Sequence, residues 1–203
     1  MQEQISEFQI DQLKEIMNIG ASHASTALSQ MVEQPVSLTV PFAHIDTIDN
    51  IEKYYNNPND QVRAVLIKVF GDINGLMYFL FSHKNEKKLV DLLLQYIKDK
   101  KVKKELESSV VEELGNVLVG ASLTAFSKFL DLNLLHSFSK VFCGSLIDVV
   151  KKVGIEVVGE KGVALMFQID FSISGEQNID TNFMFFVDSK ATETLLNALK
   201  LKY

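Results

Sequence analysis

Residues 11–29 read DQLKEIMNIGASHASTALS, and residues 109–127 read SVVEELGNVLVGASLTAFS. When residues 11–41 are aligned with residues 109–139 without a gap, they share five identities in 31 positions. The identities include a Glu and an Asn three residues apart, and many of the remaining positions keep their chemical class. The chain is therefore predicted to contain two copies of one structural plan.

The same order of segments follows each of these helical stretches. Each half continues with extended, β-rich runs and closes with an amphipathic helix. The expected runs are residues 36–45, 62–70 and 76–81, then 134–142, 163–172 and 182–187, and the expected helices are 83–98, 145–152 and 191–200. Turns and short links between strands favour antiparallel pairing, with the helices on one face. We expect an α+β fold with a shared, mainly antiparallel sheet, forming one domain (1–203) of two pseudo-symmetric halves, about 1–100 and 101–203.

The composition narrows the class of protein. The chain has 203 residues, 47% of them hydrophobic, and a net charge of −6. A nucleic-acid binder needs a basic surface, so no nucleic-acid partner is expected. The basic cluster Lys98 to Lys104 is expected to be a solvated link, and Cys143, in an apolar context, a buried structural thiol. No run approaches 18 apolar residues and residues 1–9 lack the features of a secretion signal, so we expect a cytoplasmic protein without membrane insertion.

Each repeat helix carries the same polar stripe. Asp11, Glu15 and Asn18 fall within about 60° of helical arc, and Ser109, Glu113 and Asn116 repeat that geometry. Asn is unfavourable in the middle of a helix because its side chain competes for backbone hydrogen bonds. Glycines are unfavourable there too, and Gly20, Gly115 and Gly120 are expected to allow another backbone to approach closely.

Two interpretations of the stripe stay open. It is either a solvated helix face or a functional surface. The sequence contains no HExxH, Walker A, GxSxG or EF-hand pattern that would supply another chemistry. A carboxamide can position a water molecule, and phosphoryl transfer depends mostly on alignment and charge stabilisation. The functional interpretation is a surface that completes the active site of another protein, with Glu pairing with that protein's Lys.

The pattern (Asp/Ser)-x3-Glu-x2-Asn-x22-Pro resembles the signature of the CheC/CheX/FliY phosphatases of chemotaxis. The first copy matches it fully with Asp11, Glu15, Asn18 and Pro41. The second copy matches with Ser109, Glu113 and Asn116 but has Ser139 where the pattern expects Pro. Two motif-bearing helices in about 200 residues are most similar to the CheC type.

The resemblance implies a CheC-like fold with the two motif helices side by side, and a phosphatase acting on the aspartyl phosphate of the response regulator CheY. If this chain works as that family does, Asn18 and Asn116 would orient the attacking water, while Glu15 and Glu113 would pair with the regulator's Lys. Asp11, Ser109 and Pro41 would support the site. No cofactor is expected on this chain, since Mg²⁺ belongs to CheY, and CheD is a further expected partner. A weakly catalytic or non-catalytic adaptor that binds CheD or flagellar-switch components is the alternative.

Overall fold

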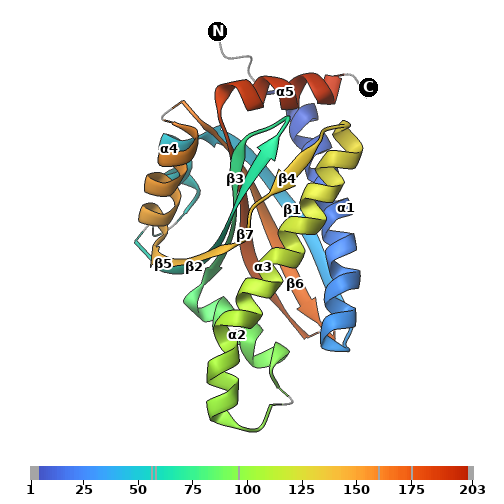
Figure 1. Cartoon of the computed structure of the whole chain (residues 1–203), viewed down its shortest axis with the longest axis vertical. Helices are drawn as coiled ribbons and strands as arrows, with labels where there is room; N and C mark the ends of the chain where they lie inside the picture. The colour runs from blue at the N-terminus through green and yellow to red at the C-terminus, as the bar shows by residue number, and fades with distance from the viewer. Residues whose placement is uncertain are drawn as a thin grey trace.

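The computed structural model describes residues 5–200 except 56, 58, 96, 160 and 175, and its α-helices and β-strands are labelled in Figure 1. The first half contains α1 (Glu7–Val32), β1 (Val36–Thr47), η1 (Ile48–Tyr54), β2 (Gln61–Gly71), β3 (Gly75–Ser82) and α2 (His83–Leu93). The second contains α3 (Lys100–Leu130), β4 (Leu134–His136), β5 (Lys140–Ser145), η2 (Asp148–Lys152), α4 (Val153–Val158), β6 (Val163–Ile173), β7 (Glu176–Val187) and α5 (Ser189–Lys200).

The strands form one antiparallel sheet in the order β1-β6-β7-β3-β2-β4, with β5 also paired to β2. The two halves exchange strands: β1 of the first half pairs with β6 of the second, while β4 and β5 of the second pair with β2 of the first. Neither half therefore closes a sheet by itself. The predicted α+β class with a shared antiparallel sheet is confirmed, and the origin of the halves by duplication stays a prediction.

Helices cover both faces of the sheet. The larger core lies between one face and α1, α3, α2 and α5, and it contains aromatic side chains in tilted contact, such as Phe79, Phe167 and Phe183. The smaller core lies on the other face, where η1, η2 and α4 cover Leu66, Tyr78 and Phe186. The chief helices thus share one face as expected, and the short helical segments occupy the other.

The two long helices end in the same way. Glu33 and Asp131, which are 98 positions apart, both adopt left-handed backbone conformations with φ of 54° and 56°. Their backbone N–H groups donate to the carbonyls of Ser29 and Ser127, which are likewise equivalent. This cap satisfies carbonyls that the end of a helix leaves free. The repeat in sequence is thus also a repeat in local structure.

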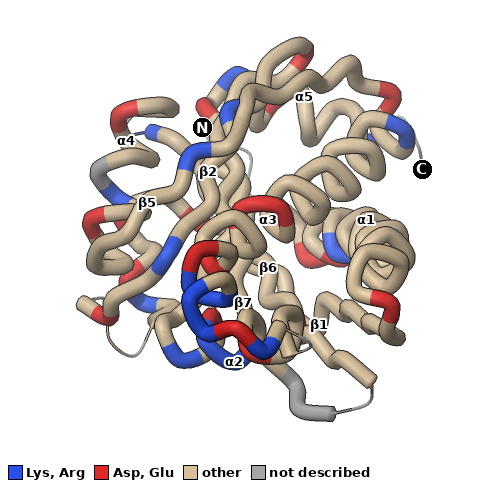
Figure 2. The backbone as a smooth tube through the Cα atoms, turned by 60° about the horizontal axis from the view of Figure 1, so that its bottom comes forward, with Lys and Arg blue, Asp and Glu red and all other residues tan. Residues whose placement is uncertain are grey.

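The helix α3 begins earlier than the sequence suggested. Its N-cap is Asp99, whose carboxylate accepts from the backbone N–H groups of Lys101 and Val102. The cluster Lys98 to Lys104 is largely exposed, as expected of a solvated segment, but the expectation of a link is wrong for most of it, which forms the first turns of α3. These turns protrude below the sheet beside α2 in Figure 1, and Figure 2 shows lysines gathered there.

The structure bears on two expectations drawn from composition. Cys143 is exposed, so the prediction of a buried thiol is wrong. It lies on β5 at the border of the sheet, where half of the strand's residues are exposed and the others are half-buried. In the described part of the chain, no helix combines the length and apolar character needed to span a membrane.

Candidate functional site

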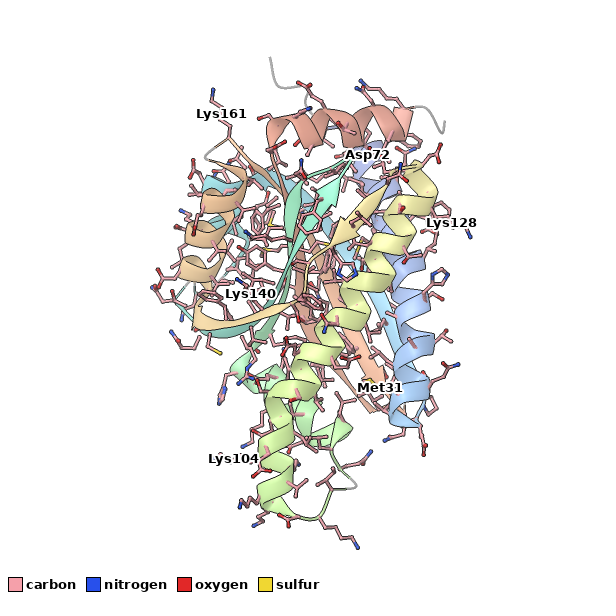
Figure 3. All side chains as sticks on the ribbon, in the orientation of Figure 1. Met31, Asp72, Lys104, Lys128, Lys140 and Lys161 are labelled. Carbon is pink, nitrogen blue, oxygen red and sulfur yellow. The ribbon has the colours of Figure 1, made fainter. Side chains whose placement is uncertain are left out.

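The two motif helices pack against each other in opposite directions. A Cβ atom added to Gly20 would lie 3.0 Å from the Cα of Ser122, so the helix backbones nearly touch there. In Figure 3, Met31 marks the C-terminal end of α1 at the bottom and Lys128 that of α3 at the top. Because the helices are antiparallel, the two copies of the motif lie towards opposite ends of the helix pair.

The three glycines of these helices differ in role. Gly20 permits the contact between α1 and α3, as predicted. Gly115 permits contact with the sheet instead, since a Cβ there would lie 2.6 Å from a methyl carbon of Val65. Gly120 faces open space, because a Cβ added there would meet no atom of a neighbouring element within 4 Å. The prediction of close backbone approach is therefore confirmed at Gly20, but it is wrong at Gly115, whose nearest neighbour is a side chain, and at Gly120.

The motif side chains lie on the outer surface of their helices. Asp11 and Glu15 of the first copy are exposed, as are Ser109 and Glu113 of the second. The opposite helix faces are buried in the core; their buried members include Leu13, Met17, Ala21, Ala24, Leu28, Val111, Leu114, Leu118 and Ala125. Asn18 and Asn116 are half-buried, so each lies at the border between the exposed stripe and the core-facing side.

Asn18 has a structural partner that the sequence did not reveal. Its Oδ1 accepts a hydrogen bond from the backbone N–H of Val40, at 3.0 Å. Two serines continue the same row along α1: Ser25 Oγ accepts from the N–H of Leu38 at 2.9 Å, and Ser29 Oγ accepts from that of Val36 at 2.8 Å. These three side chains pair the outer edge of β1, whose backbone donors would otherwise lack a strand partner.

The polar row ends where β1 changes register. The pairing of β1 with β6 shifts between Thr39 and Phe42, so that Val40 and Pro41 together oppose a single residue of β6. Pro41 has no N–H to give to the sheet, and prolines in strands are found at such bulges and at edges. The bulge places the N–H of Val40 opposite Asn18.

The second copy of the motif has a different arrangement. Among the described residues, Asn116 has no hydrogen-bond partner for its side chain. The strand is interrupted between β4 and β5, and Phe138, which aligns with Val40, is 97% exposed. Ser139, which replaces the proline, donates from Oγ to Oε1 of Glu112 at 2.6 Å. The carboxamide of Asn116 is therefore not held by the strand that follows its helix.

A groove adjoins the second copy. It has a volume of about 540 Å³ and lies between the C-terminal end of α1, the end of α2 and the first half of α3. Its lining residues are Met31, Val32, Glu33, Leu93, Leu94, Ser109, Val110 and Glu113. Two motif residues thus contribute to it, whereas Asn116 does not. In the described part of the chain, no group of three or more His, Cys, Asp or Glu is arranged to hold a metal ion.

The start of α3 is fastened to the sheet by an arginine. Arg63 on β2 places Nε 2.8 Å from Oε1 of Glu86 on α2, an ionic contact without the alignment of a hydrogen bond. Its guanidinium also donates to the hydroxyl of Ser108, at 3.2 Å. Arg63 therefore links β2, α2 and the turn of α3 that carries Ser109.

Replacement of Arg63 by Met is expected to lower the free energy of unfolding by about 2 kcal/mol, because the largely buried carboxylate of Glu86 loses its counter-charge. Lys103→Met is the matched control, since Lys103 pairs with the exposed Asp91. An exposed pair contributes at most about 1 kcal/mol. Urea unfolding of both variants measures the difference, and equal losses would contradict it.

The sequence of this chain is similar to those of known proteins. A model of the CheC-like family matches residues 8–45, the segment that holds the complete first motif. The chain is 27% identical over 200 residues to the CheY-P phosphatase CheC of Bacillus subtilis, and the match covers 96% of this chain and 95% of that protein.

Solved structures show the same fold. The crystal structure of FliY from Thermotoga maritima matches with a TM-score of 0.76 and 18% identity, covering 98% of both chains. The FliM middle domain from H. pylori matches with a TM-score of 0.61 and 12% identity over 96% of this chain and 99% of that one. The chemotaxis protein CheX from Desulfovibrio desulfuricans matches with a TM-score of 0.53 and 15% identity over 86% and 99%. The sequence match and the shared fold together confirm the predicted resemblance to the CheC-like family.

Proposed function

We propose that this chain is a phosphatase that hydrolyses the aspartyl phosphate of the response regulator CheY. The observation that carries the proposal is the match, over nearly the whole length of both chains, to a protein described as a CheY-P phosphatase. The exposed Glu and half-buried Asn, present once on each long helix, support it. Such a surface is open to a folded protein partner.

The proposed reaction needs little covalent chemistry from this chain. The oxygen of a water molecule attacks phosphorus, the bond between phosphorus and the acyl oxygen breaks, and the regulator's aspartate and inorganic phosphate are released. In this proposal Asn18 and Asn116 orient the water, and Glu15 and Glu113 pair with a lysine of the regulator. Alignment of the attacking water supplies the catalysis, as in other phosphoryl transfers. Mg²⁺ would be held by CheY.

The proposal is tested by release of phosphate. CheY from the same organism is phosphorylated with acetyl phosphate, the donor is removed, and phosphate is measured with and without this protein. We expect faster release at substoichiometric amounts, because a catalyst turns over. Release at the unassisted rate, even with equimolar protein, would overturn the proposal.

The alternative function is an adaptor that binds CheD or flagellar-switch components without hydrolysis. The same preparation distinguishes it when a pull-down with purified CheD accompanies the phosphate assay. Binding of CheD without faster phosphate release would favour the adaptor. Faster release together with CheD binding would indicate a phosphatase that CheD contacts.

A further inference from the structure

We infer that the backbone N–H of Val40 is a positioning group for the carboxamide of Asn18, and that the bulge at Pro41 holds it in place. The first copy of the motif then presents an amide held by the strand, whereas the second presents one that no described residue holds by a hydrogen bond. This inference rests on the proposed function and concerns how its two sites differ.

A row of side chains fixes the register between α1 and β1. Asn18, Ser25 and Ser29 follow one side of α1 and meet the N–H groups of Val40, Leu38 and Val36, which alternate along β1. Each serine hydroxyl also donates to a carbonyl of its own helix, Ser25 to Ala21 and Ser29 to Ser25. The serine contacts fix the helix against the strand, and Asn18 is the last member of the row.

The contact with Val40 uses the oxygen of the Asn18 carboxamide and leaves its NH₂ group available. A carboxamide offers one carbonyl oxygen and one NH₂ group. Oδ1 is directed towards β1 by its bond to Val40, and the described residues provide no acceptor for Nδ2. The side chain is therefore held with its NH₂ group available to an oxygen atom of the incoming partner or water. Holding a reacting group in one orientation removes an entropic cost from the reaction.

The second copy of the motif lacks the contacts that hold Asn18. Leu123 stands where the first copy has Ser25, so the row of polar contacts is broken. Phe138 aligns with Val40 but extends into solvent, and Ser139 bonds to Glu112 rather than shaping a bulge. Asn116 has no side-chain hydrogen bond to any described residue. The two carboxamides differ in the very contact that would orient them.

A measurement of side-chain motion tests the inference independently of activity. In ¹⁵N relaxation experiments, the NH₂ group of Asn18 is expected to be rigid on the picosecond-to-nanosecond timescale and that of Asn116 to be mobile. Pro41→Ser, which introduces the residue of the second copy, should make Asn18 as mobile as Asn116. Equal mobility of the two side chains in the wild-type protein would overturn the inference and leave the proposed function untouched.

Kinetics provides the second arm. Asn116→Ala isolates the first site, and addition of Pro41→Ser to this variant is expected to lower kcat about tenfold with KM for phosphorylated CheY unchanged, since small displacements of a reacting group are costly. Thr39→Ala, an exposed position of β1 outside the polar row, is the control and should keep kcat. An unchanged kcat in the folded Pro41→Ser variant would refute the positioning role. Lack of acceleration by the wild-type protein would instead refute the proposed function.

Discussion

Replacement of both Asn18 and Asn116 by Ala is expected to return the hydrolysis of phosphorylated CheY to its unassisted rate. Under the proposed function each Asn orients the attacking water, and loss of one oriented catalytic group typically costs about 10²-fold or more. Either single variant should retain the activity of the other site. Phosphate release by the three variants, compared at equal concentrations of folded protein, measures the effect.

The stability of the two single variants should differ. Asn18→Ala leaves the N–H of Val40 without its acceptor, which is expected to cost about 1 kcal/mol of unfolding free energy. Asn116→Ala breaks no hydrogen bond to a described residue and should be close to neutral. Asn18→Asp keeps an oxygen for Val40 but removes the NH₂ group, so it should preserve stability while losing activity at the first site.

Two controls accompany the test of the asparagine variants. His23→Ala lies on the exposed surface of α1, about 140° of helical arc from Asn18 and outside the row that contacts β1, and should keep both activity and stability. Circular dichroism of the double variant should show the wild-type helix content. A folded double variant that hydrolyses phosphorylated CheY at the wild-type rate would remove both asparagines from the mechanism.

The main outline of this fold was predictable because it depends on local patterns. The β-rich runs of the strands and the apolar stripes of the helices are properties of neighbouring residues. The repeat at a shift of 98 positions showed the same order of segments twice. The repeat also extends to features outside the predicted elements, such as the left-handed caps at Glu33 and Asp131. The exchange of strands between the halves was not predictable, because pairing between distant strands leaves no local pattern.

The site was predictable only in part, because one of its contacts joins residues that are distant in the sequence. The exposed positions of Glu15 and Glu113 follow from helical periodicity, and the structure places them so. The bond between Asn18 and Val40 joins residues 22 apart through the packing of a helix on a strand edge. The sequence offered no packing reason for Asn18, although the serines that follow on the same side of α1, Ser25 and Ser29, were a usable signal in hindsight.

The contact between the two motif helices supports the second large prediction. Gly20→Leu is expected to lower the free energy of unfolding by about 3 kcal/mol, because overpacking of a filled interface typically costs about 1–3 kcal/mol or occasionally more. The atoms nearest to the new Cβ belong to the backbone of Ala121 and Ser122, which cannot rotate away as a side chain would. The helices must separate instead, and both copies of the motif lie on them.

Gly120→Leu is the matched control on the partner helix. Its Cβ would meet no atom of a neighbouring element within 4 Å, so the substitution should gain about 0.8 kcal/mol from helix propensity alone. The same chemical change thus has opposite expected signs at two positions of one helix pair. Urea unfolding of both variants decides the matter, with unchanged m-values showing that the unfolded states are comparable. If Gly20→Leu were neutral or stabilising, the close contact of the two motif helices would not be a constraint on the fold, and the antiparallel arrangement that separates the two sites would need another explanation.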